Sequence, residues 1–521
     1  MPETIYDYVI IGSGFGGAVS ALRLSEKDYK VLIIEKGKRY NSNDFPTTNW
    51  QLKKWLWLPS FRLFGIMKMT FFQHIGVLSG VGVGGGSLVY ANTLAQPKQA
   101  FYQSGSWAKL ADWENELKPY YETASVMLGA ALNPNLELGD QYLKKLAAKQ
   151  KREAHFEPTK VSVFFGEPDI TVSDPYFGGK GPERAGCNQC GGCMTGCRYN
   201  AKNTLDKNYL YLAEKNGVEI LAEQEVIDIT EKNADGANQY EITYRDSTKF
   251  LKRKKKVNAK GVVFAGGVLG TVKLLVKLKN SSLHKLSDKV GHDVRTNNEG
   301  LIFSVSANKE KDFSKGIAIG SIYHPNENTH LEPVRYAKGS GFWRLGMLPF
   351  VIGSNTFIRL LKIMMEFLKK PLMYFKLYTV KDFARQSIVL LFMQHIDSTL
   401  SLNKGLFRLK SKVTSGQKPT AFIPEAKAIV EQYNSISGGK SFVYVSESIF
   451  NIPSTAHILG GAVMGDNIHE GVIDKDNKVF GYSNMYVCDG SSISANPGVN
   501  PSLTITAISE RAMSKVPQNK N

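Results

Sequence analysis

The sequence predicts an α/β fold with two domains, one of them assembled from separated parts of the chain. Near the N-terminus, residues 5–37 show an apolar strand, a glycine-rich turn, a helical pattern and a second apolar strand. Much later, Val262–Phe264 and Tyr486–Cys488 are further apolar strands, and each is followed two residues on by a glycine. The length of 521 residues exceeds the size at which one hydrophobic core usually stops growing, which predicts a second domain.

The N-terminal segment carries the pattern of a dinucleotide-binding βαβ unit. Gly12 allows a tight turn after the first strand, Gly14 lets the backbone approach a pyrophosphate, and Gly17 lets helix and strand pack closely. The helix N-terminus favours a phosphate, and Glu35 at the end of the second strand is placed to bind ribose hydroxyls. Because an acidic strand end suits an unphosphorylated ribose, the pattern predicts FAD or NAD rather than NADP.

The same patterns predict the later elements. Residues 80–87 form a second glycine-rich loop, either a flexible connector or backbone pressed against something flat or anionic. Residues 215–263 predict strands with polar turns, among which Lys252–Lys256 is expected to be a solvated turn. Helical patterns follow at Val268–Leu278 and at Leu503–Met513.

Composition excludes several function classes. The chain is 42% apolar and 21% charged with a net charge of +18, but it carries no helix-turn-helix, zinc-finger or RNP pattern, which excludes nucleic acid as a partner. The sequence contains no uncharged apolar run of about 18 residues, so no transmembrane helix is predicted. Position 1 leads almost directly into the first strand without a secretory signal pattern, and four of the five cysteines are bunched. Both features predict a cytoplasmic protein.

Four segments together carry a family resemblance. They are residues 5–37, Gly82–Leu88, Val263–Gly267 and His457–Gly461, and their sequences and order resemble the glucose–methanol–choline (GMC) flavin oxidoreductases. The tail, with Tyr486–Gly490 and Gly498–Thr506, looks specifically like the cholesterol oxidase branch of that family.

Within that branch, the chain is most similar to the mycobacterial type. The similar segments are Asp174–Gly179, the cysteine block with Ala201–Leu205 after it, and His330–Tyr336. The similarity extends over nearly the whole chain.

The resemblance implies a fold and a cofactor. A Rossmann-like FAD-binding domain is expected from residues 1–100, 197–302 and 448–518. A substrate-binding domain, with a mostly antiparallel sheet covered by helices, is expected from residues 101–196 and 303–447. The residues expected to bind FAD are Gly12, Gly14, Phe15, Gly17, Glu35, Gly86, Asn92, Val226 and Gly490.

The resemblance also implies a catalytic set. His457 and Asn500 match the family's catalytic histidine and asparagine, and Glu332 is the candidate for its glutamate base. Flavin-dependent alcohol oxidation removes a hydride from carbon and a proton from oxygen, and an imidazole can donate or accept a proton near neutral pH. The alternatives are a core histidine at position 457, a turn residue at position 500, and a salt-bridge carboxylate at position 332.

The expected activity is oxidation of a 3β-hydroxysteroid to the 3-ketosteroid, with electrons passed to O2 to give H2O2. Migration of the double bond from Δ5 to Δ4 is expected at Glu332, because a carboxylate can carry a proton between carbons. An alternative is an FAD-dependent dehydrogenase for a long-chain or terpenoid alcohol, with a quinone or another carrier as electron acceptor. A third class is a non-catalytic flavin-binding lipid carrier.

A cysteine block has the spacing of a bacterial ferredoxin motif. Cys187, Cys190, Cys193 and Cys197 follow that spacing, but Arg198 stands where the motif has proline, and there is one run only. The block therefore predicts an iron–sulfur cluster, a zinc site or a packed or redox-active thiol loop.

Two segments have the composition of membrane-facing elements. Residues 354–371 predict an amphipathic helix with Met and Phe on its apolar face and basic residues, Arg359 among them, on the other. Residues 53–72 place Trp55 and Trp57, expected to be exposed, beside basic residues. Both segments predict peripheral contact with an anionic bilayer at the inner membrane face. The alternative is that they cover the core or the substrate pocket.

Overall fold

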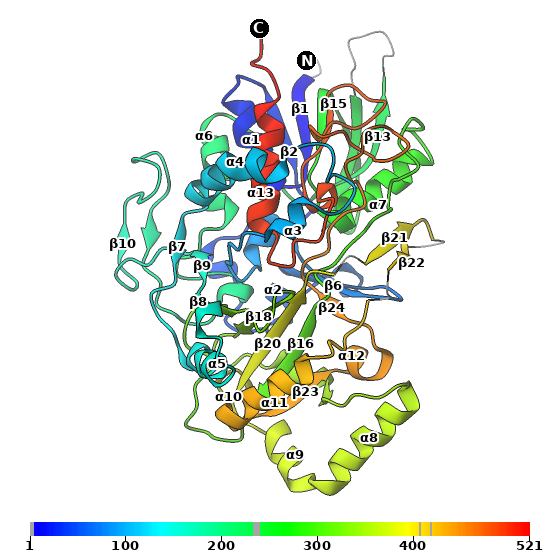
Figure 1. The fold of residues 1–521 in the computed structure, drawn as a ribbon. Helices are drawn as coiled ribbons and strands as arrows, with labels where there is room; N and C mark the ends of the chain where they lie inside the picture. Colours follow the sequence, from blue (N-terminus) through cyan, green and yellow to red (C-terminus); the bar gives the residue numbers. More distant parts are fainter. Residues whose placement is uncertain (1–4, 233–239, 397, 406–407, 417–418, 521) are drawn as a thin grey trace.

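Two large sheets organise the protein, and they lie one above the other along its long axis (Figure 1). The computed structural model describes residues 5–232, 240–396, 398–405, 408–416 and 419–520. Both described ends of the chain lie at the end of the molecule that holds the first sheet. The fold is mixed α/β, as the sequence predicts.

The first sheet combines parallel strands from distant parts of the chain, as the glycine-ended strands predict. Strand β1 pairs in parallel with β2 and with β15, β12 pairs with β2, and β25 pairs with β15. Strands β13 and β14 extend the sheet in antiparallel fashion. The strands are β1 (Ile5–Ile11), β2 (Val31–Ile34), β12 (Glu219–Leu221), β13 (Gln224–Glu231), β14 (Tyr240–Asp246), β15 (Lys254–Phe264) and β25 (Met485–Val487).

The basic run at Lys252–Lys256 differs from the prediction of a solvated turn. Lys254, Lys255 and Lys256 are the first residues of β15, where they pair with β14. Their side chains are exposed, so the run is solvated, but its second half is strand.

Helix α1 (Phe15–Ser25) lies close against the first sheet because of one glycine. A Cβ added to Gly17 would lie 2.1 Å from the Gly12 carbonyl oxygen and 3.1 Å from the Ala265 Cβ. The helix also packs against α6 (Tyr209–Lys215) and α13 (Ser502–Ser514), and α13 packs against α4 (Trp113–Met127) (Figure 1). Helix α7 (Val268–Lys279) begins after the Gly-Gly turn of β15, as predicted.

The second sheet is antiparallel throughout, with strand order β19-β23-β16-β20-β18-β17-β8. The strands are β8 (Phe156–Pro158), β16 (Gly300–Val305), β17 (Ser321–Tyr323), β18 (Thr329–Val334), β19 (Met347–Pro349), β20 (Ser387–Gln394) and β23 (Lys440–Tyr444). The antiparallel sheet covered by helices is confirmed. Strand β16 (Gly300–Val305) crosses the predicted domain boundary between residues 302 and 303. The domain boundaries themselves stay a prediction.

Side chains along β20 alternate between the two faces of this sheet. Leu390 and Phe392 pack into a cluster with α5 (Leu138–Lys149) and α11 (Ala426–Ser437). Val389 and Leu391 point the other way, into a cluster with α9 (Pro371–Tyr378).

The expectation that Trp55 and Trp57 are exposed is wrong. Both side chains are buried, and Trp55 packs edge-to-face against Phe342 at 5.0 Å and Trp343 at 5.3 Å between ring centroids. Composition cannot distinguish an aromatic side chain that points inward from one that points outward. Among the described residues, no helix is long and apolar enough to cross a membrane.

The predicted amphipathic helix is confirmed as α8 (Thr356–Lys369), but its orientation was not predicted. Arg359, expected on the solvent face, is buried and donates hydrogen bonds to the carbonyl oxygens of Gly353 and Ile449.

We expect Gly17→Ala to destabilise the apoprotein by about 1–3 kcal/mol, because the new methyl group overlaps the Gly12 carbonyl. Gly270→Ala, inside α7, is the matched control: its Cβ meets nothing within 4 Å, and a stabilisation of about 0.4–1 kcal/mol is expected. Chemical denaturation measures both. An unfolding free energy of Gly17→Ala equal to that of the unsubstituted protein would contradict the close packing.

Candidate active site

A cavity of about 1530 Å³ joins the two sheets. One end is lined by the turn after β1, with Gly12 and Gly14, and the other by Val389 and Leu391 of β20. The nucleotide-binding pattern of the sequence and the apolar face of the second sheet therefore open into the same space.

Most of the predicted cofactor-binding residues line this cavity. Those that do are Gly12, Gly14, Phe15, Glu35, Gly86, Val226 and Gly490. Gly17 is a packing residue. Asn92 is buried outside the lining, although its neighbours Ala91 and Thr93 belong to it.

The two glycine-rich loops form one cradle. The backbone N–H of Gly84 donates to Ser13 Oγ at 3.1 Å, and Ser13 Oγ donates to Glu35 Oε2 at 2.8 Å. A Cβ added to Gly85 would lie 2.7 Å from the Gly14 Cα, so the second loop presses directly against the first. The flexible connector predicted as one reading of residues 80–87 is wrong, whereas contact of this loop with something flat or anionic stays a prediction.

The cradle fits the adenosine diphosphate half of FAD. A Cβ on Gly14 would have no neighbour nearer than 3.9 Å, so this position faces the open cavity. The Glu35 carboxylate is held at the strand end by the backbone N–H groups of Ser13, at 3.1 Å, and Gly37, at 2.7 Å. An acceptor fixed beside a glycine turn at a helix N-terminus suits ribose hydroxyls and a pyrophosphate.

Three lysines line the nucleotide end of the cavity, and one of them, Lys68, was expected among the basic residues of the membrane-facing segment 53–72. They are Lys36, Lys68 and Lys273. Burial, together with the positive charges of Lys36 and Lys273, lowers the pKa of Lys68 to about 7. Clustered positive charge facing an open cavity favours an anionic ligand, which agrees with a pyrophosphate.

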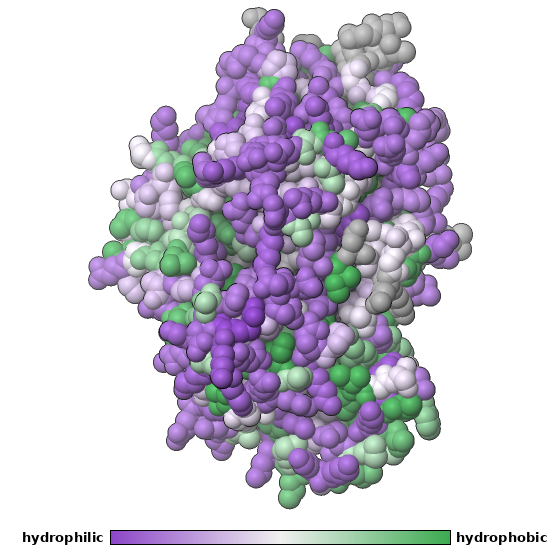
Figure 2. All heavy atoms as spheres, in the orientation of Figure 1, coloured by the Kyte–Doolittle hydropathy of each residue, from purple (hydrophilic) through white to green (hydrophobic). Residues whose placement is uncertain are grey.

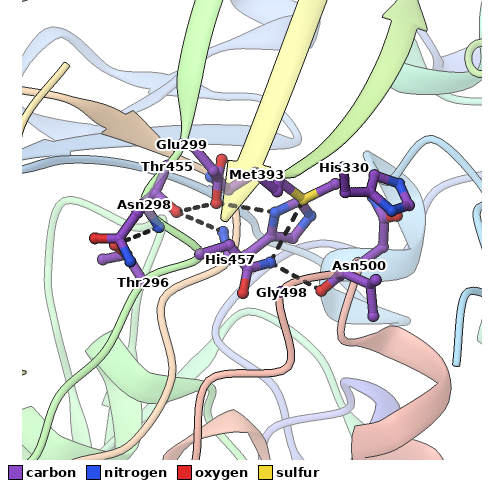
Figure 3. A network of polar contacts seen from close by, with 12 residues as sticks. Thr296, Asn298, Glu299, His330, Met393, Thr455, His457, Gly498 and Asn500 are labelled. Carbon is purple, nitrogen blue, oxygen red and sulfur yellow. Dashed lines mark hydrogen bonds and ion pairs between the residues drawn. The ribbon is translucent and has the colours of Figure 1, made fainter. Parts of the chain in front are cut away.

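His457 lines the cavity and is held by a glutamate that sequence reasoning missed (Figure 3). His457 Nδ1 lies 2.9 Å from Glu299 Oε1, and the backbone N–H of Ala456 donates to Glu299 Oε2 at 3.0 Å. Thr455 Oγ1 also donates to this carboxylate. Because a carboxylate only accepts, Nδ1 carries the hydrogen, and Nε2 is left for a molecule in the cavity. Glu299 precedes β16 in a segment without a recognisable motif, so the sequence offered no signal for it.

Asn500 and Glu332 form a second part of the site. Glu332 on β18 is fully buried; His330 Nε2 lies 2.8 Å from Oε1, and Asn500 Nδ2 donates to Oε2 at 3.3 Å. Asn500 lines the cavity, and its Oδ1 is buried without a hydrogen-bond partner. Glu332 does not line the cavity, but Asn500, which does, bonds directly to it.

Two carboxylates affect the pKa of His457. Burial alone would lower the pKa of this imidazole, but the Glu299 carboxylate, with a smaller contribution from Glu332, raises it above its ordinary value. The alternative of a core histidine bonded to the backbone is therefore wrong, because the ring bonds to a carboxylate and lines the cavity.

The cysteine block shows no metal site. All four cysteines are described and unpaired, and among the described residues no group of three or more His, Cys, Asp or Glu side chains is arranged to hold a metal ion. Burial raises the pKa of Cys187 and raises that of Cys190 to about 11. Neither the iron–sulfur prediction nor the zinc alternative is supported.

We expect Glu299→Gln to lower the pKa of His457, because the variant removes the larger of the two negative charges beside it. Protonated His457 stabilises the fold below the ordinary pKa of 6.5, and this stabilisation is lost as the pH rises through the higher folded-state pKa. In the variant this pH dependence should shrink. NMR titration of His457 measures the first effect, and urea unfolding across this pH range the second. The exposed Glu122→Gln serves as a control, and an unchanged His457 titration in Glu299→Gln would contradict the pairing.

Comparison with known proteins agrees with this geometry. The chain is 42% identical to a cholesterol oxidase from Acinetobacter baumannii, over 98% of this chain and 94% of that protein. It is 39% identical to a cholesterol oxidase from Mycobacterium tuberculosis (strain ATCC 25618 / H37Rv), over 98% of this chain and 91% of the relative. The crystal structure of pyridoxine 4-oxidase from Mesorbium loti superposes with a TM-score of 0.62, covering 98% of this chain and 99% of that one. At 13% identity this likeness shows the fold alone.

Sequence models of one family cover most of the chain. Residues 6–296 and residues 390–509 match the two parts of the GMC oxidoreductase model. GMC oxidoreductases use FAD, which agrees with the glycine cradle and with Glu35 at its edge. The chain belongs to the GMC oxidoreductase family and is an FAD-dependent oxidoreductase that acts on CH–OH groups.

Proposed function

We propose that this protein oxidises the hydroxyl group of a 3β-hydroxysteroid, such as cholesterol, to the ketone. The observation that carries the proposal is an apolar chamber next to His457 and Asn500, in the half of the cavity bounded by the second sheet. Its apolar lining includes Leu301, Phe303, Ile319, Val334, Val389 and Leu391. A rigid hydrocarbon skeleton fills such a chamber by burying apolar surface, while its one hydroxyl group needs a polar partner. The names of the two bacterial relatives support the same substrate class.

The side chains have separate tasks in this proposal. Bound FAD supplies the acceptor for the hydride that leaves the carbinol carbon. His457 Nε2 takes the hydroxyl proton, and the Glu299 carboxylate stabilises the imidazolium that results. Asn500 also lines the cavity, and the Nδ2 hydrogen that does not go to Glu332 can donate to the oxygen of this hydroxyl group. Glu332 holds Asn500 in place through Nδ2.

Three finer steps belong to the same proposal. The electrons pass to O2 and give H2O2, the double bond of the product moves from Δ5 to Δ4, and the protein takes its substrate from the inner face of the membrane. The names of the relatives support the first step, the two carboxylates beside His457 support the second, and an exposed apolar face supports the third.

We expect His457→Gln to lower kcat for cholesterol about 10²- to 10⁴-fold, because the acid–base group at the hydroxyl oxygen is lost. Bound flavin, measured by its visible absorbance, should be unchanged. A peroxide-coupled assay measures turnover, and the exposed His284→Gln serves as a control. If the unsubstituted protein reduces an artificial dye with a long-chain alcohol and forms no peroxide with cholesterol, the alternative dehydrogenase activity is correct instead.

We expect Glu332→Gln to release the unconjugated ketone, because a neutral amide cannot carry a proton between two carbons. Chromatography of the products, with the conjugated ketone detected by its ultraviolet absorbance, measures the ratio of the two. Glu332→Asp, which keeps the carboxylate, should retain part of the isomerisation. Fully conjugated product from Glu332→Gln would remove Glu332 from this role and leave Glu299, the carboxylate that lines the cavity beside His457.

A further inference from the structure

Helices α8 and α9 present an apolar face to the solvent. Phe357 and Leu368 on α8 are 74% and 72% exposed, and Leu372 on α9 is 76% exposed. Monomeric soluble proteins rarely expose a contiguous apolar surface of this kind without an interaction partner. We call it the α8–α9 face; its side chains are Phe357, Leu360, Leu361, Met364, Met365, Leu368, Leu372 and Phe375. Figure 2 shows hydrophobic side chains at the lower right, where Figure 1 places α8 and the neighbouring α12.

The orientation of α8 is fixed by its inner side. Arg359 Nη2 donates to the Ile449 carbonyl oxygen at 2.7 Å, and Thr356 Oγ1 donates to the same oxygen at 3.1 Å. Ile363 is buried on this side as well. The apolar side chains of the exposed face therefore do not cover the core, whereas Ile363 and Phe367 of the same helix do.

The charges around the face are almost all positive. Between residues 350 and 381 the sequence has six basic residues and one acidic residue, Glu366. Glu366 is turned toward the protein, where Lys440 lies 3.2 Å away and the Tyr374 hydroxyl donates to it at 2.6 Å. The exposed lysines of α8, α9 and the residue between them are Lys362, Lys369, Lys370 and Lys376. Apolar side chains flanked by lysines are the composition of a helix that lies in the interface of an anionic bilayer.

Part of the exposed lining of the cavity belongs to segments next to the same face. Helix α8 packs against α12 (Val445–Phe450) and β19, and Leu345, just before β19, and Val445 both line the cavity. Leu345 is 70% exposed, and Val445 is exposed too. Leu58 and Phe71 complete an apolar rim, since they also line the cavity and reach solvent.

We propose that the α8–α9 face seats this protein on an anionic lipid bilayer, with the rim of the cavity against the membrane. A hydrophobic substrate then passes from the bilayer to the apolar chamber without crossing water, where its solubility is lowest. The inference rests on the proposed function for the identity of that substrate, whereas docking itself depends only on the exposed face and its lysines.

Co-sedimentation with phosphatidylglycerol and phosphatidylcholine vesicles tests the docking. The flavin-loaded protein should bind phosphatidylglycerol vesicles at low salt. It should bind phosphatidylcholine vesicles more weakly, and high salt should weaken its binding to phosphatidylglycerol vesicles. Phe357→Ser/Leu361→Ser/Leu368→Ser should lower the partition coefficient at least about 100-fold, because three large apolar side chains no longer enter the lipid. Phe250→Ser/Leu251→Ser, two exposed apolar side chains at the β14–β15 turn, is the matched control and should bind like the unsubstituted protein.

A second measurement separates docking from catalysis. The triple variant should oxidise detergent-dispersed cholesterol like the unsubstituted protein, but vesicle cholesterol at least about 10-fold more slowly. Vesicle binding without oxidation of any sterol would overturn the proposed function and leave the docking intact. Equal vesicle binding by the triple variant would overturn the docking proposal. A stable dimer in sedimentation analysis that the triple variant abolishes would overturn it too, in favour of a second copy of this chain on the face.

Discussion

The two buried carboxylates beside His457 are the constraint on which the site depends. A carboxylate away from water is tolerated when hydrogen bonds replace its hydration. Glu299 accepts from Thr455, Ala456 and His457, and Glu332 lies within hydrogen-bond reach of His330 and accepts from Asn500. His330 lies on a strand of the second sheet, and the other partners come from residues 455–457 and from the loop at Asn500, so satisfying the two carboxylates joins distant parts of the chain.

The same arrangement gives the cavity two chemically different ends. At one end, glycines and a strand-end glutamate leave backbone N–H groups and space for a dinucleotide. At the other end, alternate residues of β20 and its neighbours supply an apolar wall. His457 and Asn500 lie between them, so a substrate hydroxyl at the boundary meets an acid–base group while its hydrocarbon body stays out of water.

The sequence predicts best where backbone geometry demands a particular residue. The turn after β1 needs Gly12 at a φ of 100°, and the close approach of α1 needs Gly17, so the pattern identifies the βαβ unit without tertiary information. His457, Asn500 and Glu332 came from a resemblance, and the structure brings them together with distances that the sequence does not contain. Glu299 could not be found, because an isolated glutamate before a strand has the same local pattern whether it bonds a histidine or the solvent. Trp55 and Arg359 were placed on the wrong side for a similar reason: periodicity separates two faces of an element, but only packing decides which face is buried.

Anaerobic mixing of the flavin-loaded protein with cholesterol tests the central claim most directly, because it isolates transfer from the carbinol carbon to the cofactor. The account predicts that the yellow absorbance of oxidised flavin disappears in one turnover. This loss should be much slower with cholesterol deuterated at the carbinol carbon. Flavin that stays oxidised with every sterol, or is reduced equally fast by a small alcohol that cannot fill the apolar chamber, would contradict it.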